Sequence, residues 1–181
     1  MKSVRATLLA LTALLGLAAC GEGAQVSTLP TPREPGPDSV GYFCGMAVAE
    51  HPGPKGQVFL RGQSEPLWFT SVRDALAFTI LPGEPRTVVA LYVSDMGRST
   101  DGREPLSGAW VLAHDAVFVV GSTAVGGMGA REVVPFADRA AAERFRVVHG
   151  GAIYRFGEVP ENLILGADGG LASAPTAPAH Q

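Results

Sequence analysis

Short runs of apolar residues, separated by polar or glycine-rich turns, recur through the middle of the chain. Their shortness predicts strands, because amphipathic helices need longer periodic segments. We expect strands at 58–60, 67–69, 88–93, 109–113, 116–120, 133–136 and 153–156. His114 and Asp115 separate two of these runs, which predicts a hairpin with His114 at its tip.

Two segments carry the signals of helix ends. Ser71, followed three residues later by Asp74, resembles a capping box, and the helix it opens should end near residue 80, before a Pro-Gly pair. Asp138 is expected to cap a second helix that ends near residue 149, before two glycines. Strands mixed with a few helices predict an α+β fold.

A weak internal repeat relates the two parts of this pattern. At an offset of 67 residues the matching positions are Gly62, Glu65, Phe69 and Phe78 with Gly129, Glu132, Phe136 and Phe145. We therefore expect two pseudo-repeated ββαβ units, about 38–105 and 106–169, packed together with one helix each and with mixed or antiparallel sheets. A second set of matches, at an offset of 77 residues, pairs Asp38, Val40, Ala47 and Val48 with Asp115, Val117, Ala124 and Val125. These matches relate loop 41–46 to loop 121–129 and predict that the two loops approach each other between the units.

The beginning of the chain has a different pattern. Lys2 and Arg5 precede an apolar run over 8–17 that is too short to cross a bilayer, and the sequence Leu-Ala-Ala follows directly before Cys20. This order of features predicts a lipoprotein signal peptide over residues 1–19. It would be removed after lipid has been attached to the Cys20 thiol.

The mature chain is then expected on the periplasmic side of a membrane, held by its lipid, and Gly21 after the lipidated cysteine favours the outer membrane. Residues 20–37 predict a flexible tether, 38–169 the globular part and 170–181 a disordered tail. Without the leader, 12 Lys and Arg stand against 17 Asp and Glu, a balance of −5. This charge argues against nucleic acid as a partner.

The two cysteines of the chain lead to the candidate chemistry. If Cys20 carries lipid, Cys44 has no disulfide partner in a compartment that oxidises thiols. The sequence Cys44-Gly45-Met46 places a thiol and a thioether two residues apart, and the glycine permits a turn that brings both onto one ion. Soft sulfur ligands select Cu(I), whereas Zn(II) usually takes four thiolate, imidazole or carboxylate ligands. A buried, inert cysteine is the alternative.

Three further residues are candidate ligands. Met128 lies among glycines and Met96 in a polar turn, both unusual surroundings for an apolar side chain, although core packing remains the alternative for each. His51 begins a turn rich in Pro and Gly and could be an auxiliary ligand or a surface contact. No role is assigned to the remaining histidines, His114, His149 and His180.

These motifs together resemble the NosL family of lipoproteins, accessory factors for nitrous oxide reductase assembly. The resemblance covers essentially the whole mature chain and rests on Tyr-Phe-Cys-Gly-Met at 42–46, Ala-Glu-His-Pro-Gly-Pro-Lys at 49–55, Tyr-Val-Ser-Asp-Met at 92–96, Trp110, Gly-Gly-Met-Gly at 126–129, Glu-Arg-Phe at 143–145 and the glycines at 150 and 151. Cys44 and Met46 match the family's copper motif, and Met128 is our choice for the third ligand.

The resemblance implies two ββαβ halves and a Cu(I) chaperone without enzymatic activity. It would deliver copper for the copper-sulfide cluster of nitrous oxide reductase, to the reductase itself or to its membrane-associated maturation complex. Two other functions stay open on the residues alone. Cys44 could be the nucleophile or redox centre of an enzyme, although no His and acidic residue are placed recognisably with it and no Cys-x-x-Cys pair occurs. The chain could also be a structural lipoprotein of the same pathway whose sulfurs are incidental.

Overall fold

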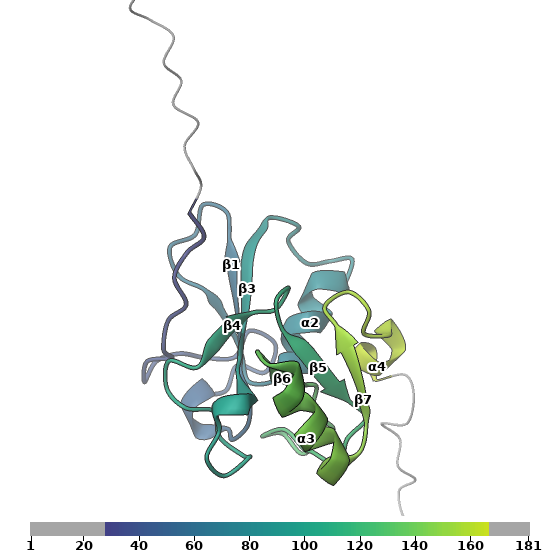
Figure 1. The fold of residues 1–181 in the computed structure, drawn as a ribbon. Coiled ribbons are helices and arrows are strands. Elements are labelled where there is room, and N and C mark those ends of the chain that lie inside the picture. Colours follow the sequence, from purple (N-terminus) through teal and green to yellow (C-terminus); the bar gives the residue numbers. More distant parts are fainter. Residues whose placement is uncertain (1–27, 167–181) are drawn as a thin grey trace, which may run out of the picture.

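The strands and helices of the computed structural model, which describes residues 28–166, lie close to the positions that the apolar pattern predicts (Figure 1). In chain order they are η1 (Val48–Glu50), β1 (Gly56–Leu60), β2 (Leu67–Phe69), α2 (Val72–Ile80), β3 (Val88–Ser94), η2 (Met96–Arg98), β4 (Trp110–Leu112), β5 (Val117–Val120), β6 (Val134–Phe136), α3 (Arg139–His149), β7 (Ala152–Arg155) and α4 (Glu161–Leu165). The expected signal peptide, Cys20 and the tail lie outside the described residues. No described helix is long and apolar enough to cross a membrane.

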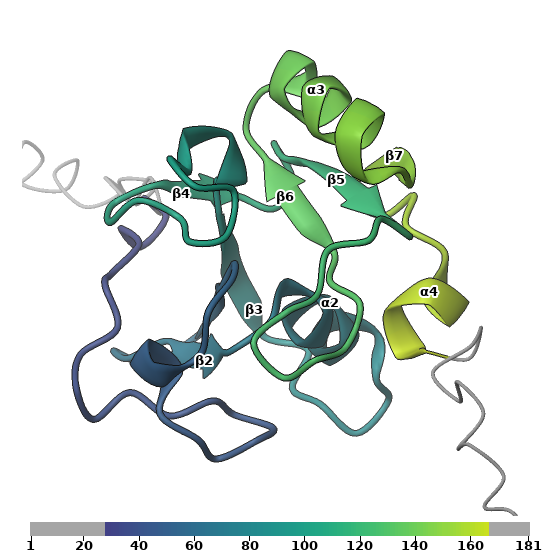
Figure 2. The ribbon, with the colours of Figure 1, turned by 90° about the horizontal axis from the view of Figure 1, so that it is seen from below.

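Two antiparallel sheets form the framework of the molecule, which confirms the predicted α+β class (Figures 1 and 2). The first sheet has the strand order β2-β1-β3-β4 and the second has the order β6-β5-β7. Helix α2 packs on the first sheet and α3 on the second. Every strand pair is antiparallel, so the mixed alternative does not apply to the described strands.

Both predicted helix caps are present. The Ser71 hydroxyl accepts a hydrogen bond of 3.0 Å from the backbone N–H of Asp74, which satisfies one free donor of the first turn of α2. The Asp138 carboxylate accepts two backbone N–H groups in the first turn of α3. Gly150, with φ of +73°, ends α3 where the sequence predicts. The caps fix the ends of the helices relative to the loops that precede them.

The predicted hairpin at His114 is wrong. β4 pairs with β3 in the first sheet, whereas β5 lies at the centre of the second. The connection bends sharply because the N–H of Ala116 bonds to the carbonyl of Leu112. Ala113 and Ala116 are both buried, and their small side chains let the backbone pass through the core. His114 therefore lies where the chain crosses from one sheet to the other.

One apolar core joins the two sheets. It combines side chains from the first sheet and α2 with side chains from the second sheet and α4, among them Val58, Phe69, Val72, Phe78, Val93, Phe118, Val133 and Ile164. β4 follows residue 105 and yet completes the first sheet, and α4 packs on α2 from the far end of the chain. A strand of the second predicted half, β4, therefore completes the sheet of the first half.

The described end of the predicted tether lies against the outer face of the first sheet. The backbone N–H of Arg33 donates to the side-chain oxygen of Gln57 (2.9 Å), whose amide donates back to the Arg33 carbonyl (3.0 Å). The Tyr92 hydroxyl donates to the carbonyl of Pro30 (2.8 Å). This face carries buried aromatic side chains, which the segment covers. The contacts extend the packed part of the chain into the 20–37 segment, back to Pro30.

Candidate metal centre

Cys44 and Met46 lie on a tight loop of residues 41–46, which we call the sulfur loop. The backbone N–H of Gly41 donates to the carbonyl of Met46 (2.8 Å), and that of Gly45 donates to the carbonyl of Gly41 (2.7 Å). Gly45 has φ of +65°, a left-handed conformation that glycine adopts without steric cost. The loop therefore closes on itself and presents Cys44 at its turn.

The Cys44 thiol is free and half-buried, and it lies against Gly41. A Cβ atom at position 41 would lie 2.5 Å from Cys44 Sγ and 3.1 Å from Cγ2 of Thr70. Gly41 is therefore required for space, because any side chain there would displace the thiol. The backbone N–H of Tyr42 donates to the carbonyl of Trp68 (2.7 Å), which ties the sulfur loop to β2.

Thr70 connects the sulfur loop to Met128, which lies on a second loop of residues 126–129, called here the glycine loop. Its Oγ1 lies 3.5 Å from Cys44 Sγ and donates to Met128 Sδ at 3.7 Å. Thr70 is 2% exposed, whereas the Met128 side chain is 51% exposed. A thiol and a thioether from distant parts of the sequence thus meet at one buried hydroxyl.

The connection between β5 and β6, which includes the glycine loop, lies beside α2 and reaches the first half of the molecule (Figure 2). The expected approach of the two loops is therefore present in the structure. Residues 28–166 hold no group of three or more His, Cys, Asp or Glu side chains placed to bind a metal ion. The donors that meet in this region are two sulfur atoms, Cys44 Sγ and Met128 Sδ, and both lie within hydrogen-bond reach of Thr70 Oγ1.

The remaining ligand candidates fall in different surroundings. Met46 shares the sulfur loop with Cys44 and is 37% exposed. Met96 is buried in a second apolar cluster with Phe136 and Ala141, so core packing accounts for this side chain. Its polar neighbour Asp95 made the segment resemble a surface turn, but that carboxylate is occupied with the backbone N–H groups of residues 97 and 137.

His51 lies beside the glycine loop. Its Nδ1 is 2.9 Å from the carbonyl of Ala47. A Cβ atom at Gly127 would lie 2.8 Å from the His51 Cβ and 2.7 Å from the carbonyl oxygen of Pro52. The absence of a side chain at position 127 therefore permits the crossing of the two segments, next to Met128. This placement keeps His51 as a candidate auxiliary ligand.

Glu132 ties the connection that carries the glycine loop to helix α2, a role that the sequence did not reveal. Its Oε1 accepts the backbone N–H of Arg73 (3.2 Å), in the first turn of α2, and that of Val133 (2.8 Å). The other oxygen, Oε2, has no hydrogen-bond partner and lies against Gly126. Burial is the main cause that raises the pKa of Glu132 to about 7, from an ordinary value of 4.5.

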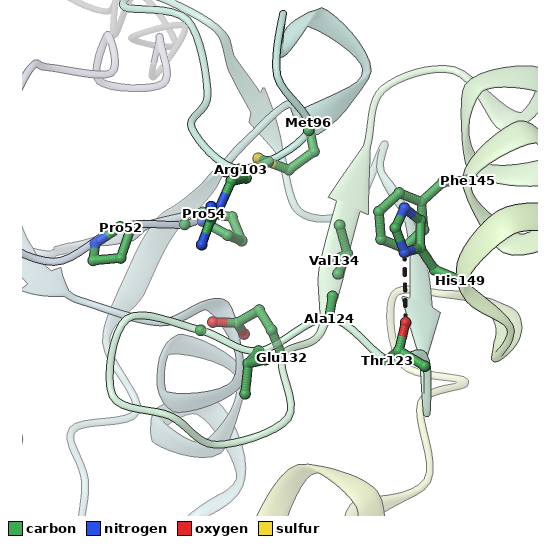
Figure 3. Close-up of a pocket in the computed structure, with 14 residues that line it drawn as sticks. Pro52, Pro54, Met96, Arg103, Thr123, Ala124, Glu132, Val134, Phe145 and His149 are labelled. Carbon is green, nitrogen blue, oxygen red and sulfur yellow. Dashed lines mark hydrogen bonds between the residues drawn. The ribbon is translucent and has the colours of Figure 1, made fainter.

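Glu132 also lines a pocket of about 320 Å³ (Figure 3). Pro52 and Pro54 form one wall, and His149, from α3, lies on the opposite side. The His149 ring stacks on Phe145, with the ring centroids 4.3 Å apart. Glu132 and Gly126, the first residue of the glycine loop, both line this pocket.

The ionisation of Glu132 predicts a pH dependence of stability. A folded-state pKa above the unfolded value means that the stabilisation is complete below about pH 4.5 and is lost as the pH rises through 7. The variant Glu132→Gln keeps the oxygen that accepts the N–H groups but does not ionise. Between pH 4.5 and 7.5, the wild type should therefore lose up to about 3 kcal/mol of unfolding free energy relative to the variant. Urea unfolding of both proteins at several pH values measures this, and a difference independent of pH would contradict it.

The two loops, together with Val125 directly before the glycine loop, also expose apolar side chains. The exposed fractions are Tyr42 44%, Phe43 42%, Val125 61%, Met46 37% and Met128 51%. Tyr42 and Phe43 contact each other and the buried Phe69, with ring centroids 5.3 to 5.8 Å apart. The sulfur loop thus carries partly exposed aromatic side chains that rest on the buried Phe69.

The comparisons with known proteins agree on one family. The NosL family model matches residues 32–164. The copper-binding lipoprotein NosL of Achromobacter cycloclastes is 39% identical over 154 residues, which are 84% of this chain and 79% of that protein. The lipoprotein of the same name from Stutzerimonas stutzeri is 35% identical over 159 residues, 87% of this chain and 81% of that protein.

A solved structure gives the same result. The crystal structure of the copper chaperone NosL from Shewanella denitrificans matches the present structure with a TM-score of 0.67 and 32% sequence identity. The match covers 73% of this chain and 98% of that chain.

Proposed function

This chain belongs to the NosL family, and on that premise we propose that it is a Cu(I) metallochaperone that delivers copper for the copper-sulfide centre of nitrous oxide reductase. It is a carrier and not an enzyme. Copper as the metal is supported by the names of the relatives, which are copper-binding lipoproteins, and of the structural neighbour, which is a copper chaperone. The choice of Cu(I) rests on the softness of the sulfur donors.

The observation that carries this proposal is the meeting of Cys44 Sγ and Met128 Sδ at the Thr70 hydroxyl. A thiolate and thioethers suit a Cu(I) ion of low coordination number, and methionine is a poor ligand for Zn(II). We assign Cys44, Met46 and Met128 as the copper ligands, with His51 as an auxiliary one. Met96 is left out because its side chain is packed in the core.

Exposure of the site supports handover of the ion. Met128 and Met46 are partly exposed beside a half-buried thiol, so a partner can approach the ion from solvent. Each sulfur or imidazole of the partner would then replace one ligand in turn, without release of free copper. The exposed apolar side chains of the sulfur loop and the glycine loop would contact the partner, which is nitrous oxide reductase or its membrane-associated maturation complex.

The location follows from the lipoprotein motif. We propose that Cys20 carries the lipid and holds the chain on the periplasmic side of a membrane. Gly21 after Cys20 favours the outer membrane. The names of the curated relatives, which are lipoproteins, support the anchor. Residues 20–29 would provide the reach between the membrane and the packed domain.

The strand orders of the two sheets support an internal duplication. We infer that β1-β2-α2-β3 and β5-β6-α3-β7 descend from one ββαβ unit. In support, the strand that begins each unit lies between the other two, in the orders β2-β1-β3 and β6-β5-β7. The second unit would contribute the glycine loop, between β5 and β6, and the segment that precedes β1 would contribute the sulfur loop.

Catalysis by Cys44 is the second candidate. Among the described residues, the hydrogen-bond partner of this thiol is the Thr70 hydroxyl, which is neither a general base nor a resolving thiol. The geometry therefore favours the carrier over an enzyme.

Cu(I) titration tests the assignment on the mature chain with the substitution Cys20→Ser, which leaves one thiol. X-ray absorption of the loaded protein should report sulfur neighbours at bonding distance from copper. Met46→Leu keeps the bulk of the side chain and removes its sulfur, so we expect weaker Cu(I) binding in competition with a chromophoric Cu(I) chelator. Met96→Leu is the matched control and should bind as the parent does. A spectrum without sulfur neighbours would remove the site from these loops.

A further inference from the structure

Thr70 occupies the one residue between β2 and the N-cap of α2. No local pattern singles it out, since a threonine at a strand end is common. In the folded chain its hydroxyl contacts sulfur atoms from two separate loops, and its side chain is 2% exposed. A buried hydroxyl between two sulfur atoms is a specific arrangement, because polar groups in the interior need partners.

The directions of the two hydrogen bonds follow from the chemistry of the groups. The thioether of Met128 can only accept, so the Thr70 hydroxyl proton points to Sδ. The oxygen then accepts from the S–H of Cys44. In the metal-free protein this makes a directed chain, from the Cys44 thiol through the Thr70 hydroxyl to Met128.

We propose that Thr70 is a positioning residue, which holds the sulfur atoms of Cys44 and Met128 together before copper arrives. This inference rests on the proposed function. Thr70 does not itself coordinate the ion. Its hydroxyl makes the two loops into one preformed site.

Thr70 can do this because its own backbone is fixed from both sides. Ser71 caps α2 directly after it, and Phe69 before it is buried in the core. Glu132, below the glycine loop, accepts the N–H of Arg73 in the same helix turn. The sulfur loop and the connection that carries the glycine loop are thus both hydrogen-bonded to residues 68–73.

The physical gain is pre-organisation. Met128 has a flexible side chain, is half exposed and is flanked by glycines, so without a partner it would sample many conformations. Copper binding would then have to order this side chain, and the lost conformational entropy would lower the affinity for Cu(I). Removal of the hydroxyl should therefore weaken Cu(I) binding by about tenfold, the scale of ordering one flexible side chain.

Three substitutions in the mature Cys20→Ser chain separate the hydroxyl from the bulk of the side chain. Thr70→Val keeps the shape and removes the hydroxyl, whereas Thr70→Ser keeps the hydroxyl. Thr79→Val is the matched control, because the Thr79 hydroxyl donates to the carbonyl of Leu76 in its own helix. In competition with a chromophoric Cu(I) chelator we expect Thr70→Val to bind about tenfold more weakly, and the other two variants within about twofold of the parent.

A second measurement needs no copper. In metal-free protein with ¹³C-labelled methionine methyl groups, the Met128 resonance should move toward that of a free side chain in Thr70→Val. It should stay in place in Thr70→Ser and in Thr79→Val. If Thr70→Val does not fold, Thr70→Ala provides the same comparison.

The outcomes separate the inference from the proposed function. If Thr70→Val changes neither the Cu(I) affinity nor the Met128 resonance, or if Thr70→Ser is as weak as Thr70→Val, the role of the hydroxyl is overturned. Copper binding that depends on Cys44 would in that case still stand. If Cys44→Ala binds Cu(I) as the parent does, the proposed function fails, whatever the methyl spectrum shows.

Discussion

Replacement of Cys44 by alanine is expected to abolish nearly all Cu(I) binding. Cys44 supplies the thiolate of the proposed site, and the other proposed sulfur ligands, Met46 and Met128, are neutral thioethers that hold Cu(I) more weakly. The chain with Cys20→Ser has no second thiol that could take its place. Competition with a chromophoric Cu(I) chelator measures the loss, which should exceed that of Met46→Leu by a wide margin.

The fold should survive this change. The Cys44 side chain is half-buried and lies on a loop, so loss of its sulfur removes little packed apolar area. Unaltered near-UV circular dichroism of Cys44→Ala would exclude unfolding as the cause of lost binding. If Cys44→Ala and Met46→Leu both bound Cu(I) as tightly as the parent, the site would have to lie elsewhere.

Phe118→Ala should lower the free energy of unfolding by about 3–5 kcal/mol, the range for buried aromatic truncations. Phe118 lies on the central strand of the second sheet and is fully buried. It belongs to the same apolar cluster as Phe69 and Phe78, which come from the first half of the chain. Urea denaturation of variant and parent gives the difference.

The same experiment tests whether the halves fold as one unit. Because the cluster spans both sheets, unfolding of the variant should stay a single transition by fluorescence and by circular dichroism. Val147→Ala is the control, since that side chain on α3 is 77% exposed and its truncation should cost less than about 0.5 kcal/mol. Two separate transitions, or a loss at Phe118 as small as that at Val147, would contradict a shared core.

Local signals in the sequence predicted much of the fold. The apolar runs gave the strands, and Ser71 and Asp138 gave the helix starts, because a cap needs only the residues of its own turn. The hairpin at His114 failed for the opposite reason. Two adjacent strands look the same in sequence whether they pair with each other or with partners in two sheets, and that choice depends on the whole core.

In the candidate site, too, local sequence signals identified some residues, whereas others depend on contacts between distant parts of the chain. Cys44 and Met46 could be selected because they are neighbours in the chain and share one chemistry. For Met96 the sequence left ligation and core packing open, because the turn around it is polar, and the structure places its side chain in the core. Thr70 and Glu132 were missed, because nothing near either residue in the sequence shows which distant group it will face.

By itself the sequence determined what is local: the lipoprotein motif, the strand and helix segments, and the lone thiol two residues from a thioether. Only the tertiary structure decided that Cys44 and Met128 share the hydroxyl of Thr70, and that Glu132 ties the glycine loop to α2. The physical reason is that caps, turns and ligand spacing depend on a few consecutive residues. Contacts between loops depend on how two sheets bury one common core, and that is a property of the whole chain.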